Sequence, residues 1–207
     1  MTATTIAPLS TAHSQLVFRA VMEALARPGT VHRLPASGDA GGPPAALLPV
    51  LALADLGTSA CVLAGEGEWA DVVRAMTFAP PAGLAQARLV AALRPVTDEE
   101  LAQLRTGTPA APEDGALACL SVAGLRTLPE DGSPAGEDGG DGRPLRLSGP
   151  GIAGTTGLLV TGLPPGFAAV RRELTSGFPA GADLLLVTSD GDLVGLPRTT
   201  LIDEEAR

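Results

Sequence analysis

Two spacings of apolar residues divide this chain into expected helices and expected strands. Residues 15–26 show helical spacing, and their buried side is expected to consist of five apolar residues: Val17, Phe18, Val21, Met22 and Leu25. Ser14 is the expected N-cap, and Pro28 with Gly29 ends the helix because the residue before a proline avoids the helical conformation. The pattern therefore predicts one long amphipathic helix in the N-terminal region.

The rest of the chain alternates between the two spacings. Further helices are expected at residues 45–54, 66–76, 97–104 and 164–177. Strands are expected at residues 30–34, 61–65, 87–93, 116–125, 143–148, 157–163 and 183–188. Asp190-Gly191 is a hairpin sequence, so the last strand is expected to pair antiparallel with 183–188. This order predicts an α/β fold in which a mixed β-sheet is flanked by helices on both faces.

Polar residues in these elements have expected structural uses. Thr97 and Glu100 have the spacing of a capping box, which would begin a short helix. Asp55 is expected to close a corner through local hydrogen bonds. Arg171 and Arg172 lie in the middle of the expected helix 164–177, and we assign both to its solvated face.

The chain has the size and composition of a single domain. With 207 residues, of which 45% are hydrophobic, it can bury one core, and we place the domain at 15–202. Residues 1–14 form a polar N-terminal tail and 203–207 a C-terminal tail. Residues 128–142 are glycine-rich and acidic, so they are expected to form a mobile surface loop. The acidic residues of this loop lack the spacing of a calcium loop.

Charge and composition exclude several classes of function. The net charge of -9 argues against a nucleic-acid surface, which would need clustered basic residues. No apolar run reaches the ~18 residues that span a bilayer, and no signal-peptide pattern is present. Cys61 and Cys119 have apolar neighbours and are expected to be reduced thiols, which favours a cytoplasmic protein. Since His13 and His32 are distant from both, no metal site is predicted.

The most distinctive polar pattern follows the expected strand 143–148. Arg146 and Ser148 alternate there with leucines, and Gly149-Pro150-Gly151 follows directly. Two glycines around a proline allow the backbone amides of 151–154 to converge on one point, which suits an anion. The same sequence also suits a tight turn packed against a neighbouring element, and both interpretations stay open.

Six residues together form a candidate ligand site for a phosphate or phosphonate: Arg146, Ser148, Gly149, Gly151, Asp183 and Arg198. The two guanidinium groups and the turn amides would bind the anion, and Asp183 would orient an arginine. The alternative is that Asp183 and Arg198 form a buried ion pair that fixes the C-terminal strand. No nucleophile with an adjacent base is visible, so no catalytic residue is predicted, and whether the chain is an enzyme is left open.

The order of several short segments resembles the PhnH family, a subunit of the bacterial carbon–phosphorus lyase core complex. The segments are FRAVMEALARPG (18–29), LLPVLALADLGTS (47–59), PEDGA (112–116), LSGPGI (147–152), FPAGAD (178–183) and GLPRTT (195–200). The resemblance implies a fold like that of the pyridoxal-phosphate-dependent transferases, reduced in size. All 14 basic residues are arginines, so the lysine that binds this cofactor is absent and no cofactor is expected.

The resemblance also implies a function carried out in a complex. The expected partners are PhnG, PhnI, PhnJ and PhnL-type subunits. With PhnG, PhnI and the PhnL-type subunit, the chain would help to transfer the ribose triphosphate of ATP to an alkylphosphonate, and PhnJ would cleave the carbon–phosphorus bond afterwards. ATP is then a substrate of the complex, and the product would go on to carbon–phosphorus bond cleavage. The isolated chain is expected to form a homodimer. Two alternatives remain: a free-standing enzyme, or a binding module for a small phosphorylated or phosphonate ligand.

Overall fold

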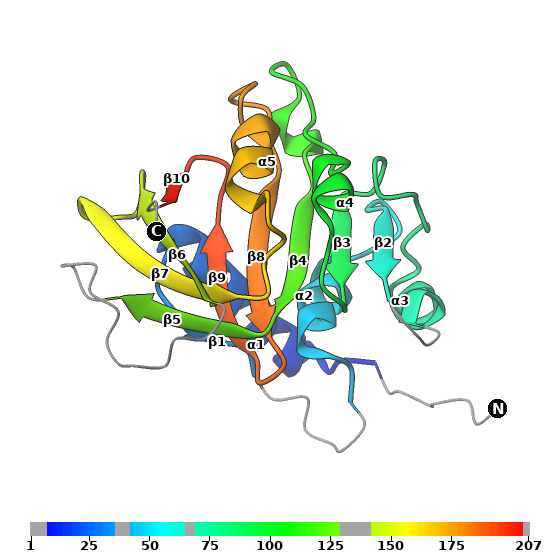
Figure 1. Cartoon of the computed structure of the whole chain (residues 1–207). Coiled ribbons are helices and arrows are strands. Elements are labelled where there is room, and N and C mark those ends of the chain that lie inside the picture. The colour runs from blue at the N-terminus through cyan, green and yellow to red at the C-terminus, as the bar shows by residue number, and fades with distance from the viewer. Residues whose placement is uncertain (1–7, 36–41, 65–68, 129–141, 205–207) are drawn as a thin grey trace.

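The computed structural model describes residues 8–35, 42–64, 69–128 and 142–204. The strands of the main sheet are His32–Arg33 (β1), Ala60–Leu63 (β2), Leu89–Ala92 (β3), Leu117–Val122 (β4), Asp183–Thr188 (β8) and Asp192–Leu196 (β9). They lie in the order β1-β9-β8-β4-β3-β2 (Figure 1). Strands β2, β3, β4 and β8 are parallel, whereas β9 and β1 run antiparallel to their neighbours. The predicted mixed sheet and its β8–β9 hairpin are therefore confirmed.

A second sheet was not predicted from the sequence. Its strands are Gly124–Leu128 (β5), Gly142–Ser148 (β6), Thr155–Thr161 (β7) and Leu201–Glu204 (β10), and all of its pairings are antiparallel. The prediction of one strand over 116–125 is wrong, because β4 ends in the main sheet and β5 begins in the second. Between them, the amide of Ala123 donates to the carbonyl of Thr161 at 2.8 Å, which directs the chain towards β7.

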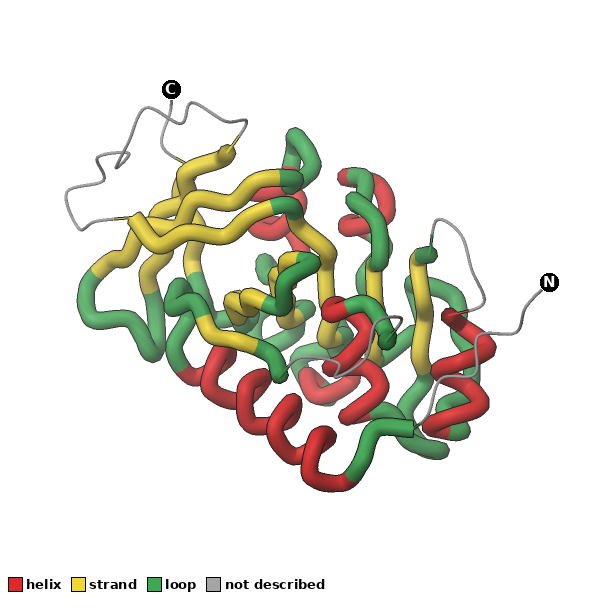
Figure 2. The backbone as a smooth tube through the Cα atoms, turned by 90° about the horizontal axis from the view of Figure 1, so that it is seen from below, coloured by secondary structure: helices red, strands yellow, loops and turns green. Residues whose placement is uncertain are grey.

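Helices cover both faces of the main sheet. One face carries Thr11–Ala26 (α1), the 3-10 turn Ala45–Leu47 (η1), Leu48–Leu53 (α2) and Trp69–Thr77 (α3). The opposite face carries Asp98–Ala102 (α4) and Phe167–Leu174 (α5), together with the second sheet. A further 3-10 turn, Pro112–Asp114 (η2), precedes β4. In Figure 2, α1 is the longest helix; it runs along the lower part of the picture, and the strands lie above it.

Both predicted tails and the predicted loop overlap helices or strands of the structure. The expected N-terminal tail 1–14 overlaps α1, which begins at Thr11. The expected C-terminal tail 203–207 overlaps β10, which extends to Glu204 and pairs with β6. Of the expected loop 128–142, Leu128 ends β5 and Gly142 begins β6, while 129–141 lie outside the described residues.

The two faces of β8 explain its uninterrupted apolar sequence. Leu184 and Leu186 pack with the second sheet and α5, whereas Leu185 and Val187 pack with α1 and α2, and all four side chains are fully buried. A strand buried on both faces loses the alternation of polar and apolar residues. The main sheet is thus the middle layer of the molecule.

Helix α1 begins earlier and buries a narrower face than predicted. Its N-cap is Ser10, whose hydroxyl accepts a hydrogen bond from the amide of His13 at 3.2 Å, so the prediction of a cap at Ser14 is wrong. The predicted burial of Phe18 and Met22 is also wrong, since these side chains are 50% and 51% exposed. The buried residues of α1 are Val17, Val21 and Ala24, and this stripe of small side chains faces the main sheet.

The close approach of α1 to the sheet depends on a glycine in β9. A Cβ atom at Gly195 would collide with the backbone carbonyl of Ala24 and would lie 2.7 Å from the amide nitrogen of Leu25. Any side chain at this position must push the helix away from the sheet.

We therefore expect Gly195→Ala to lower the free energy of unfolding by about 1–3 kcal/mol, the range typical of overpacked sites. The control is Gly124→Ala in β5, where the nearest atom to an added Cβ is the Thr161 hydroxyl at an ordinary 3.6 Å. Urea unfolding of both variants measures the difference. Equal effects at the two positions would contradict the packing argument.

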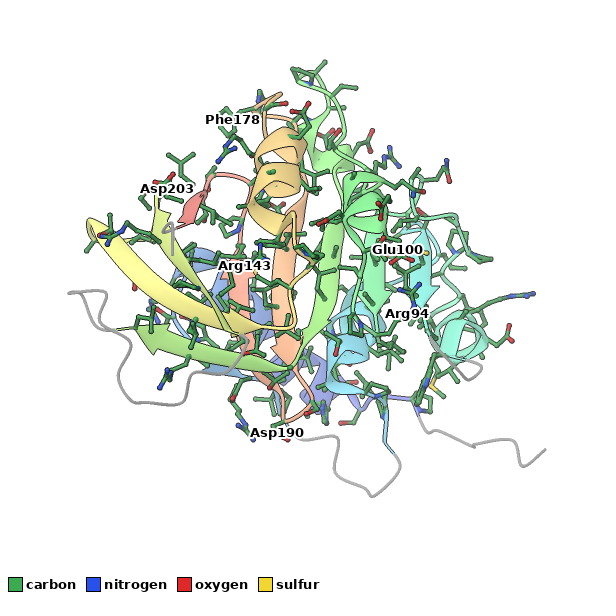
Figure 3. All side chains as sticks on the ribbon, in the orientation of Figure 1. Arg94, Glu100, Arg143, Phe178, Asp190 and Asp203 are labelled. Carbon is green, nitrogen blue, oxygen red and sulfur yellow. The ribbon has the colours of Figure 1, made fainter. Side chains whose placement is uncertain are left out.

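The predicted capping box at α4 is present and includes an arginine. The Thr97 hydroxyl accepts from the amide of Glu100 at 3.2 Å, and the Glu100 carboxylate accepts from the amide of Thr97 at 3.1 Å. Arg94, which follows β3, donates to the same carboxylate at 2.6 and 2.9 Å (Figure 3). Hydrogen bonds from Arg94 and from the Thr97 backbone lower the pKa of Glu100 to about 2.

This pKa shift predicts a pH-dependent contribution to stability. Since the pKa of Glu100 is lower in the folded chain, its contribution is complete above the unfolded pKa of about 4.3 and disappears as the pH falls through about 2. We expect Glu100→Gln to destabilise the protein at pH 7 by at most about 1 kcal/mol, because the pair is partly exposed to solvent. Urea unfolding between pH 7 and pH 2.5 should show this deficit shrinking; a constant deficit would be inconsistent with it.

Candidate functional site

The six predicted ligand residues come from three segments of the chain. Arg146 and Ser148 lie on β6, where they are opposite Asp203 and Leu201 of β10, and the side chain of Arg146 is exposed. Gly149 and Gly151 form the turn that follows. Asp183 is the first residue of β8, and Arg198 lies in the segment between β9 and β10.

The glycine turn is packed closely on its neighbours. A Cβ at Gly149 would lie 2.7 Å from the carbonyl of Thr199, and a Cβ at Gly151 would collide with the carbonyl of Ala26 and with Pro28. Both glycines have positive φ angles, of 130° and 84°. The turn is therefore needed for packing against the end of α1 and the segment after β9, which was one of the two interpretations of its sequence. Anion binding at its amides stays a prediction.

Asp183 and Arg198 form a tightly bonded ion pair. The Asp183 carboxylate accepts from the backbone amide of Arg198 at 2.6 Å, from Nε at 3.2 and 3.3 Å, and from Nη2 at 2.7 Å. Nη1 of Arg198 donates to the carbonyls of Pro112 at 2.6 Å and Pro179 at 3.3 Å. The side chain of Arg198 is only 15% exposed and that of Asp183 only 24%. Most donors of Arg198 are thus engaged by the protein itself, which favours the structural role that the sequence left open.

Arg171 was assigned wrongly from the sequence. Its side chain is 2% exposed, and Nη2 donates to the carbonyls of Leu196 at 3.2 Å and Pro197 at 2.7 Å. Burial lowers the pKa of Arg171 to about 10, Asp183 opposes this shift, and Arg198 adds to it. The helical spacing of the sequence could have shown that Arg171 is buried. Arg171 lies four residues after Phe167 and three before Leu174, which places it on the apolar side of α5.

The Asp183–Arg198 pair lies at the end of the main sheet where ligands seldom bind. Asp183 is opposite Leu117, so it is at the amino ends of the parallel strands β4 and β8. In open α/β sheets, ligands usually bind outside the carboxyl ends. At the carboxyl end of β3, Arg94 bonds Glu100, which belongs to the capping box of α4.

None of the six predicted residues lines either of two hollows formed by the described residues. One, of about 550 Å³, lies between α4, α5 and the turn at 175–180; its lining residues are Ala102, Thr106, Ala169, Val170, Glu173, Leu174, Ser176, Gly177 and Ala180. The other, of about 500 Å³, lies beside α3 and includes Leu56 and Phe78, which are 77% and 69% exposed.

The other candidate groups show no catalytic arrangement among the described residues. Cys61 and Cys119 are free thiols, and burial raises the pKa of Cys119 to about 12 and that of Cys61 as well. His32 lies on β1 opposite Leu193, with its Nε2 buried and without a hydrogen-bond partner in the described part of the chain. No three metal-ligating side chains gather within the described ranges, and no helix there is long and apolar enough to span a bilayer.

Comparison with known proteins identifies the family. Residues 9–203 match the family described as bacterial phosphonate metabolism protein (PhnH). The chain is also 34% identical over 194 residues to a protein of Stutzerimonas stutzeri named putative C-P lyase subunit protein HtxG, a match that covers 91% of this chain and 85% of that protein. This chain belongs to the PhnH family.

Three of the segments that resemble PhnH meet at Arg198. Its Nη1 bonds the carbonyls of Pro112 in PEDGA and Pro179 in FPAGAD, while Arg198 itself belongs to GLPRTT. Gly115 also lies against this arginine, because a Cβ there would collide with the Gly181 carbonyl and would lie 3.0 Å from Nη2. In this PhnH chain, the three segments therefore share one packing centre.

Arg198 and Asp183 should be strongly coupled in stability. Removal of either partner leaves a poorly solvated charge, so Arg198→Met and Asp183→Asn are each expected to destabilise the fold by about 3 kcal/mol. A double-mutant cycle measured by urea unfolding should give a coupling energy above about 1 kcal/mol. The control cycle uses Arg33 and Asp192, a pair at 2.7 Å whose arginine is 65% exposed, where we expect less than about 1 kcal/mol. Equal coupling in both cycles would argue against a structural role.

Proposed function

We propose that this PhnH chain is an accessory subunit of a carbon–phosphorus lyase assembly. The observation that carries the proposal is the family match over residues 9–203, supported by a relative that is named as a putative subunit of such an enzyme. Within the assembly, the chain is required together with its partner subunits for transfer of the ribose triphosphate of ATP to an alkylphosphonate. This step precedes cleavage of the carbon–phosphorus bond.

The chemistry of the side chains supports an accessory role. Arg198 is one of the two predicted anion clamps, with Arg146, and it donates its hydrogen bonds to Asp183 and to two proline carbonyls. The protonated thiols of Cys61 and Cys119 are poor nucleophiles at neutral pH. The sequence contains no lysine, so the Schiff-base chemistry of pyridoxal phosphate is closed to this chain. The proposal therefore gives the chain no cofactor and no complete active site of its own.

The surface supports contact with other proteins. Leu56 and Phe78 are two strongly exposed apolar side chains that line the same hollow, and exposed apolar clusters commonly mark interfaces. Phe78 also has a φ angle of 58°, an uncommon conformation for a bulky residue. In this proposal, the partners are PhnG, PhnI, PhnJ and PhnL-type subunits, and the assembly is cytoplasmic. The isolated chain forms a homodimer.

A complementation experiment tests this function. In a host whose other phosphonate genes are intact but whose PhnH gene is deleted, the tagged chain is expected to restore growth on methylphosphonate as the sole phosphorus source. It should also co-purify with the other subunits. The purified chain alone should leave ATP and methylphosphonate unchanged.

Conversion of either substrate by the isolated chain would overturn the accessory role and favour a free-standing enzyme.

A surface variant tests whether the hollow beside α3 takes part in assembly. Phe78→Ser should reduce co-purification without changing the melting temperature, whereas Leu201→Ser, at a side chain of similar 65% exposure on β10, should leave both unchanged.

A further inference from the structure

Arg171 is a buried cation with unused hydrogen-bond donors. Of its five N–H groups, the two on Nη2 face the carbonyls of Leu196 and Pro197. Nε and Nη1 are buried and have no hydrogen-bond partner within the described residues. Three donors of a charged group are therefore unsatisfied, and each buried unsatisfied donor costs about 1–3 kcal/mol.

The charges around Arg171 do not balance. The carboxylate that interacts with it electrostatically is Asp183, whose oxygens already accept hydrogen bonds from Arg198. These two arginines and one aspartate together carry a net positive charge. Arg171 remains protonated at neutral pH, because its pKa falls only to about 10. Because this one carboxylate is shared by two largely buried guanidinium groups, the excess positive charge is unfavourable and favours a bound anion.

A second buried polar group lies next to this arginine. Thr200 is 3% exposed, and its hydroxyl has no hydrogen-bond partner in the described part of the chain. The Thr200 amide donates at 2.8 Å to the carbonyl of Pro197, which also accepts from Nη2 of Arg171 at 2.7 Å. Arg171 Nη2 and the Thr200 amide thus share one carbonyl oxygen in the segment after β9, which Arg171 of α5 contacts through its hydrogen bonds.

We propose that Arg171 and Thr200 bind a small oxyanion of the phosphate or phosphonate class between α5 and the segment 196–200. Guanidinium N–H groups form strong, charge-assisted hydrogen bonds with phosphate oxygens, and a threonine hydroxyl can donate one more. Because both side chains are almost fully buried, the ligand is a small anion and not the polyphosphate of a nucleotide. The proposal concerns the isolated chain and stands whether or not it is a lyase subunit.

The test compares melting temperatures with inorganic phosphate and with chloride at equal ionic strength. At phosphate concentrations about five times its dissociation constant, the wild-type chain should melt about 3 °C higher than in chloride. Arg171→Met keeps the length of the side chain but removes its charge, and should lose this increase. The matched control is Arg172→Met, since Arg172 is the next residue of α5 and is exposed. Phosphate stabilises most folded proteins non-specifically. Binding at the proposed site is therefore measured by the difference in phosphate-dependent melting temperature between Arg171→Met and Arg172→Met.

Two further measurements keep the proposal testable if Arg171→Met does not fold. Thr200→Val removes the hydroxyl at constant shape and should weaken phosphate binding by about tenfold, which corresponds to about 1.4 kcal/mol. Titration calorimetry with phosphate, methylphosphonate and ATP should show binding of the first two and not of ATP. Equal phosphate responses in the wild type, Thr200→Val and Arg172→Met would overturn the proposal and leave an internal water as the partner of Arg171. Binding of ATP alone would overturn it as well.

Discussion

The ion pair between Asp183 and Arg198 fixes the place where the chain leaves one sheet and enters the other. Arg198 lies between β9 of the main sheet and β10 of the second sheet, and it is held by the first residue of β8 and by carbonyls of two distant segments. A guanidinium group can bond a carboxylate and several carbonyls in one plane, which a lysine cannot do. This one side chain therefore helps to set the relative position of the two sheets.

Close backbone approaches complete this arrangement. Gly195 allows α1 to lie directly on β9, and Gly151 allows the turn after β6 to pack on the end of the same helix. The second sheet is thereby connected to α1 on one side and, through Arg198, to β8 on the other. Glycine is required at these positions for lack of space, and Gly151 has a positive φ angle in addition.

The sequence was sufficient for elements whose determinants are local. The capping box at Thr97, the hairpin at Asp190-Gly191 and the buried strand β8 depend on neighbouring residues and were predicted correctly. The second sheet was missed because the sequence around Ala123 stays apolar while the chain passes from one sheet to the other, and only a distant partner, β7, reveals the break. The six candidate site residues could be listed, but the saturation of Arg198 by proline carbonyls has no pattern in the sequence.

The two buried arginines show why charge alone does not define a binding residue. Arg198 was chosen from the sequence because it follows a strand near a glycine turn, yet its donors face acceptors of the chain itself. Arg171 was assigned to solvent, yet it is buried, and three of its donors lack acceptors among the described residues. What separates a structural arginine from a candidate ligand residue is therefore the number of its donors that the fold leaves unpaired, a quantity that depends on tertiary contacts. By that criterion, Arg171 on α5 is a better candidate for anion binding than Arg198.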